Sequence, residues 1–86
     1  MADFAYEVAE AFHTFDGEEM RQCLRADIAN LGAEEASRQF ARAETILEGF
    51  LKSFQDDVAL FMVLCEAKCI ATEARRRAED YAAANA

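Results

Sequence analysis

The chain has 86 residues, no Pro and only three Gly, and its 17 Asp and Glu against nine Lys and Arg give a formal net charge of −8. A chain without Pro that is rich in Ala and Glu predicts an all-α domain rather than a β or α/β fold. The negative charge argues against direct nucleic-acid or anionic-membrane binding, which depends on Lys and Arg. We therefore expect a basic protein partner.

Residues 1–86 are expected to form one domain, which as a monomer would bury only about 60–65% of its unfolded surface, so a homodimer is an open alternative. Asp3 and Glu7 occupy positions where a secretory signal would be apolar. Three Cys, an odd number, do not make a disulfide framework. These features predict a reduced, cytoplasmic protein, and no cofactor is expected.

Residues 1–15 are predicted to form a helix with one apolar face that docks on the core. That face comprises Phe4, Val8, Ala11, Phe12 and Phe15. Residues 1–20 also hold six carboxylates and no Lys or Arg, and such a field steers basic partners, although it also serves solubility. The residues expected to bind the partner are Asp3, Tyr6, Glu7, Glu10, Asp16, Glu18 and Glu19.

Residues 16–31 form the second predicted helix, with Asp16 as N-cap in a capping box with Glu19, and Gly32 as the C-terminal stop. Asp27 lies on its apolar face and needs a partner there. We expect an ion pair with Arg38 or Arg42; the alternative is an interface position left open for another protein. The apolar face comprises Met20, Cys23, Leu24, Ile28 and Leu31.

Residues 33–54 form the third predicted helix, with a buried stripe and an opposite ridge of small side chains. The stripe comprises Ala36, Phe40, Ala43, Leu47, Phe50, Leu51 and Phe54. The ridge comprises Ser37, Ala41, Thr45, Gly49 and Ser53. Such a ridge either faces solvent or lets another helix approach closely, with Gly49 nearest.

The next boundary, Gln55 to Asp57, contains neither Gly nor Pro. Ser53 and Asp56 have capping-box spacing, which favours a break there. The alternative is one continuous helix of about 45 residues, a length typical of coiled-coil assemblies.

Residues 57–82 form the fourth predicted helix, and its segment from Val58 to Ala71 is apolar on two sides but shorter than the roughly 18–20 residues of a bilayer span. We expect the other three helices to enclose it. One side carries Val58, Phe61, Met62, Cys65, Cys69 and Thr72; the other carries Leu60, Val63, Leu64, Ala67, Ile70, Ala71 and Ala74.

The residues after Thr72 are predicted to be a polar C-terminal extension. Its charges fall four residues apart and can pair along the helix surface. The expected pairs are Glu73 with Arg77, Arg75 with Glu79, and Arg76 with Asp80.

The candidate chemistry is sparse. Cys65 and Cys69 are four residues apart and would need Cys23 and His13 to complete a zinc set, but free Cys is more often a small core residue, and we expect no metal. With one His, no Gly-rich phosphate loop and no activated nucleophile, the chain is not expected to be an enzyme.

The sequence therefore predicts a compact all-α bundle of about four helices around the segment from Val58 to Ala71. Its predicted function is that of a small acidic protein-binding module, a regulator or inhibitor that covers a basic surface of its partner, such as a nucleic-acid-binding one. Phage anti-defence inhibitors of similar composition act in this way. The alternatives are a homo-oligomeric structural or assembly protein and a cysteine-based metal or thiol site.

Overall fold

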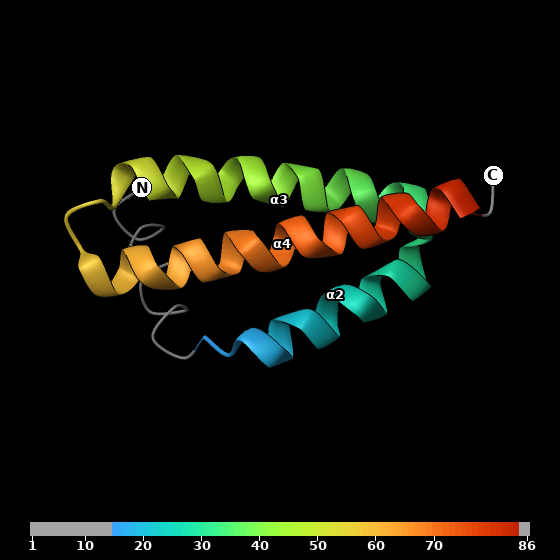
Figure 1. Cartoon of the computed structure of the whole chain (residues 1–86), viewed down its shortest axis with the longest axis horizontal. Coiled ribbons are helices and arrows are strands. Elements are labelled where there is room, and N and C mark those ends of the chain that lie inside the picture. Colours follow the sequence, from blue (N-terminus) through green and yellow to red (C-terminus); the bar gives the residue numbers. More distant parts are fainter. Residues whose placement is uncertain (1–14, 85–86) are drawn as a thin grey trace.

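The computed structural model describes residues 15–84, which fold into three helices: α2 (Gly17–Leu31), α3 (Ala33–Ser53) and α4 (Val58–Ala84) (Figure 1). The all-α class is confirmed, and each helix begins and ends within two residues of its predicted range. The predicted count of four is not matched in the described part of the chain. The predicted helix over residues 1–15 lies outside the described residues, apart from Phe15.

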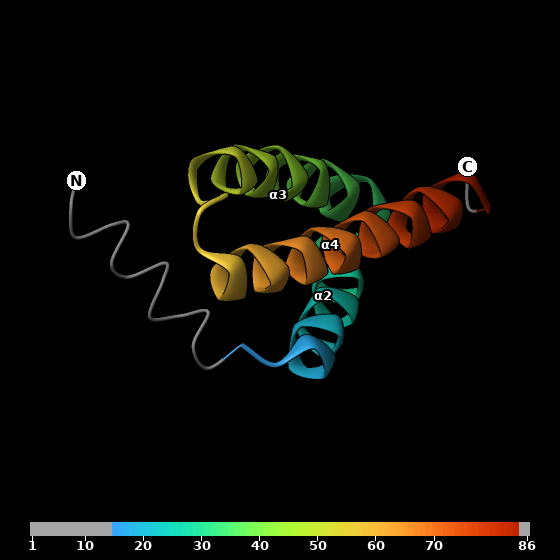
Figure 2. The same cartoon turned by 60° about the vertical axis from the view of Figure 1, so that its left-hand side comes forward.

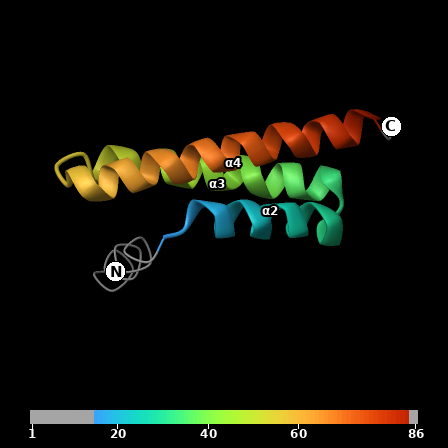
Figure 3. The ribbon, with the colours of Figure 1, turned by 60° about the horizontal axis from the view of Figure 1, so that its bottom comes forward.

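The long helices α3 and α4 run side by side as an antiparallel pair, and α2 contacts both of them (Figures 1 and 3). The molecule is elongated, with principal extents of 43 × 22 × 21 Å. Figure 2 shows the α2 axis at an angle to the α4 axis, so that α2 crosses the pair instead of aligning with it.

Both ends of α2 follow from its sequence. The Oδ1 atom of Asp16 accepts hydrogen bonds from the backbone N–H groups of Glu18, at 3.0 Å, and Glu19, at 3.3 Å, so the predicted N-cap is confirmed. At the other end Gly32 has a φ of 86°, which favours glycine, and its N–H donates to the carbonyl of Ile28. The chain therefore turns into α3 within one residue.

The break between α3 and α4 is confirmed, and the continuous helix is wrong. The predicted capping box is also wrong. Ser53 remains in the last turn of α3, where its Oγ donates back to the carbonyl of Gly49 at 3.1 Å. Asp57 caps α4 instead, because its Oδ1 accepts from the N–H of Leu60 at 3.1 Å.

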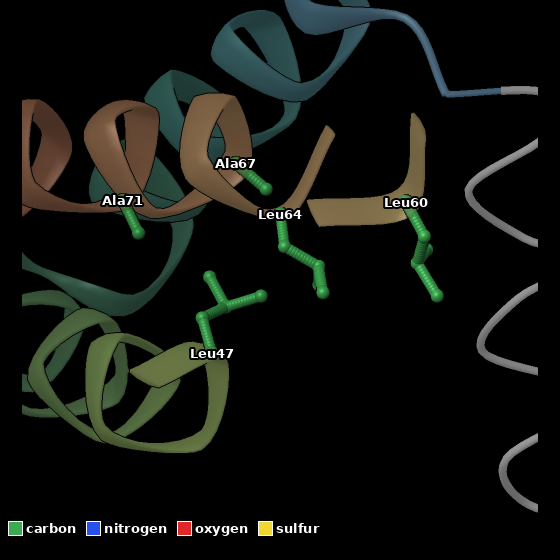
Figure 4. Packing of buried hydrophobic residues seen from close by; sticks show 5 residues of the cluster. All are labelled: Leu47, Leu60, Leu64, Ala67 and Ala71. Atoms are coloured by element: carbon green, nitrogen blue, oxygen red, sulfur yellow. The ribbon is translucent and has the colours of Figure 1, made fainter. Parts of the chain in front are cut away.

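The core lies mainly between α3 and α4 and contains two clusters. In the first, Leu47 of α3 points towards Leu64 of α4 (Figure 4). Its buried members are Leu47, Leu60, Leu64, Ala67 and Ala71. The second consists of Ala36, Phe40 and Ala78. The predicted stripe of α3 therefore supplies Ala36, Phe40 and Leu47 to the core.

The segment after Thr72 is polar on its exposed side, as predicted, but it also packs on α3. Ala78 is 0% exposed and packs with Ala36 and Phe40 near the start of α3. Ala74, one turn earlier, packs against the same cluster. Small side chains at this spacing let α3 approach closely, while Arg76 and Arg77 between them are exposed.

Only part of the apolar face predicted for α2 packs against the core. None of its residues is buried; Leu24 and Ile28 pack against the second cluster, and Met20 packs against the first. Cys23 and Leu31 are exposed. A helix that crosses the α3–α4 pair at an angle brings only part of its apolar side into contact.

Candidate functional site

One side of α4 is left uncovered by α2 and α3. Val58 is 69% exposed and Met62 is 66% exposed, whereas Leu64 and Ile70 on the other side are fully buried. Both neighbouring helices pack on the same half of α4. The expectation of a helix enclosed all round is therefore not met by the described helices. We call the uncovered side the α4 apolar stripe: Val58, Phe61, Met62, Cys65 and Cys69.

Acidic residues gather where α2 begins. Asp16, Glu18 and Glu19 lie at its first turn, where the helix dipole favours negative charge. Glu66 of α4 joins them, since a methyl group built on Gly17 would lie 2.6 Å from Glu66 Oε1. We call these four residues the α2 acidic patch.

Sequence reasoning missed Glu66 as a site residue. It follows Met62 by four residues and precedes Cys69 by three, so it borders the α4 apolar stripe. This spacing is the feature of the sequence that could have identified Glu66. The fold places the start of α2 beside Glu66, so that Glu66 borders both the stripe and the acidic residues of α2. The stripe and the patch therefore form one continuous surface with an apolar part and an acidic part.

Only three of the seven predicted partner-binding residues lie in the described part of the chain. Asp16, Glu18 and Glu19 lie together in the α2 acidic patch, whereas the other four fall outside the described residues: Asp3, Tyr6, Glu7 and Glu10. The Asp16 carboxylate is occupied as a helix cap. Glu18 Oε1 lies 3.8 Å from Arg25 Nη2, and Glu19 is exposed and forms no ion pair within residues 15–84.

The small ridge of α3 faces away from α4. Ser37 is partly exposed and the other four members are exposed. A side chain added at Gly49 would meet nothing within 4 Å, and Thr45 Oγ1 donates to the carbonyl of Ala41 at 3.2 Å. No helix of the described part of the chain docks on this ridge.

The expected partner of Asp27 is wrong. Arg38 donates to Glu35 on its own helix, and those hydrogen bonds hold the pKa of Glu35 below its usual value. Asp27 and Arg42 form no ion pair among the described residues. Asp27 is partly exposed, so its carboxylate does not need a buried partner.

A polar contact fixes the position of α4 along α3. Glu44 Oε2 accepts from Thr72 Oγ1 at 2.7 Å, and its other oxygen accepts from Arg75. Burial by itself would raise the pKa of Glu44, but the hydrogen bonds from Thr72 and Arg75 and the charges of Arg75 and Lys68 together outweigh it, so that pKa is lowered. Arg75 also pairs with Glu79 at 2.7 Å, as predicted.

The other two predicted pairs of the C-terminal segment are absent from the described ion pairs. Glu73 lies 3.4 Å from Arg21 of α2 instead. The fold offers Glu73 a partner on another helix, which same-helix spacing does not reveal.

The three cysteines do not form a common metal or thiol site in the described part of the chain. Cys23 and Cys69 are exposed and Cys65 is half-buried, so the expectation of three core cysteines is wrong. Within residues 15–84 no group of three or more His, Cys, Asp or Glu is placed to hold a metal ion. His13 lies outside the described residues. None of the described helices has the length and apolarity needed to cross a membrane.

Comparisons with known proteins leave this surface as the main guide to function, because no protein-family model, curated protein or solved structure matches the chain.

Proposed function

We propose that the chain is a small, non-enzymatic, cytoplasmic protein-binding module that regulates or inhibits a basic partner protein. The observation that carries the proposal is the continuity of the α4 apolar stripe with the α2 acidic patch. An apolar centre bordered by charge is the usual anatomy of a protein interface. The net charge of −8 favours a partner of opposite sign.

The acidic patch also argues against a second copy as the main occupant of the stripe. In a two-fold pairing centred near Cys65, Glu66 of each copy would lie close to Glu66 of the other. Like charges brought together in an interface are costly. A partner that presents Lys or Arg beside an apolar side chain meets both parts of the surface instead.

Variants on the described surface test this proposal. We expect Met62→Ser and Glu19→Lys each to lose a protein captured by the full-length chain from a lysate of its host, as measured by quantitative mass spectrometry. Ile46→Ser, at an exposed apolar position on α3, and Asp80→Lys, near the end of α4, are matched controls that should retain it. Equal capture by all four variants would contradict the proposal.

The acidic residues at the N-terminus have their own test. Charge reversal at Glu7 and Glu10 should weaken binding to the same protein and flatten its dependence on salt concentration. Binding measured at low and high salt checks this expectation. An unchanged affinity would restrict the interface to the described surface.

A homo-oligomeric assembly protein is the second candidate, and the exposure of Val58 and Met62 is the observation that favours it. Light scattering after size exclusion decides between the two. A dimer that Met62→Ser converts to a monomer would support self-assembly. A 9.6 kDa monomer at high micromolar concentration would reject it.

A further inference from the structure

A cleft between α2 and α4 differs in charge from the rest of the molecule. It is open to solvent and has a volume of about 140 Å³. Its apolar lining consists of Leu24 and Ile28 from α2 and Ile70 and Ala74 from α4. The charged lining consists of Arg21, Arg25, Glu73 and Arg77. Three of the nine basic residues of a strongly acidic chain thus surround one small apolar cleft.

The guanidinium groups that line the cleft form only long, exposed ion pairs or none among the described residues. Arg21 Nε lies 3.4 Å from Glu73 Oε2, and Arg25 Nη2 lies 3.8 Å from Glu18 Oε1; all four side chains are well exposed. Arg77 forms no ion pair among the described residues. Exposed pairs at these distances contribute little, so a carboxylate that brings its own apolar group can replace them.

The size of the cleft limits what it can hold. Drug-sized pockets measure about 300–1,000 Å³, whereas a cavity of about 150 Å³ lined by apolar side chains accommodates benzene. One aromatic ring or a short alkyl chain is the largest apolar group that fits.

We propose that this cleft binds a small amphipathic carboxylate whose single ring or short chain rests on Leu24, Ile28 and Ile70. The carboxylate lies against Arg77 and Arg21, because guanidinium groups bind carboxylates through paired hydrogen bonds. The carboxylate of Glu73 contacts Arg21 in the way proposed for the carboxylate of the ligand, which displaces it. The cleft shares no residue with the surface assigned to the partner protein, but it adjoins that surface, since Arg25 of the cleft lies 3.8 Å from Glu18 of the α2 acidic patch.

Titration of the full-length chain with phenylacetate, followed by two-dimensional NMR, tests the site. We expect saturable shifts at Leu24, Ile28, Ile70 and Ala74. Phenylacetamide has the same ring and no charge, and should bind several-fold more weakly, as expected for lost ion pairs with exposed guanidinium groups. Equal binding of the two probes, or shifts confined to other residues, would overturn the proposal.

Variants separate the roles of the charges. Arg77→Gln should weaken phenylacetate binding about two- to five-fold, while Arg42→Gln on α3 should leave it unchanged. Glu73→Gln removes the internal competitor for Arg21 and should strengthen binding several-fold. All three positions are partly or fully exposed, and unchanged helicity by circular dichroism verifies folding. Equal effects of the Arg77 and Arg42 variants, or weaker binding by Glu73→Gln, would refute the proposed geometry.

Discussion

Glu44 of α3 accepts a hydrogen bond from Thr72 of α4 at 2.7 Å, and the same carboxylate accepts from Arg75 one turn later. The Glu44 side chain is only 16% exposed. Apolar stripes tolerate sliding along a helix, but a half-buried carboxylate with two donors has one favourable position. This contact therefore sets how far α4 extends along α3, and with it the position of Glu66 and the α4 apolar stripe.

Glu44→Gln should lower the free energy of unfolding by about 1–3 kcal/mol, because it weakens hydrogen bonds of a charged, half-buried group. Urea unfolding followed by circular dichroism measures the change. Glu48→Gln is the matched control: its carboxylate is exposed and lies 3.5 Å from Lys68, so its loss should cost less than about 0.5 kcal/mol. Equal losses in the two variants would contradict the proposed role of Glu44 in positioning α4.

Acid should remove the stability that the Glu44 carboxylate contributes. The pKa of Glu44 is lowered from its ordinary value of 4.5, so the stability it adds is fully present above that pH and is lost as the pH falls through the lowered pKa. We expect the stability gap between the native chain and Glu44→Gln to be largest near neutral pH. It should shrink towards zero in strong acid, and a gap independent of pH would refute this account.

Ala78→Leu should destabilise the protein by about 1–3 kcal/mol, because Ala78 is fully buried against Ala36 and Phe40 and leaves no room for a larger side chain. Thermal and urea unfolding measure the loss. Ala59→Leu makes the same change at an exposed position of the same helix and should be nearly neutral. A neutral Ala78→Leu would contradict the close packing of Ala78 against α3.

The two glycines Gly32 and Gly49 should respond to alanine in opposite directions. Gly32 has a φ of 86°, so Gly32→Ala should cost about 1 kcal/mol or more. Gly49 lies within α3 with open space around it, so Gly49→Ala should stabilise the chain by about 0.5–1 kcal/mol. Both are read from urea unfolding, and the same sign for both would contradict the assigned backbone geometry.

The sequence by itself determined the three described helices and most of their ends. Asp16 and Gly32 act through neighbouring backbone groups, so local spacing reveals them. The stripe through Phe40 and Leu47 follows from helical periodicity, since such a face must be buried. Three of the four residues of the α2 acidic patch, Asp16, Glu18 and Glu19, were also visible in the sequence.

Only the tertiary structure decided which of two apolar sides of α4 is covered. Both have helical spacing, so periodicity cannot rank them; the packing of α2 and α3 on one side leaves Met62 exposed. The same packing brings Glu66 to Gly17, Glu73 to Arg21 and Glu44 to Arg75. These are contacts between helices, and their partners depend on how the helices cross, which no single helix encodes.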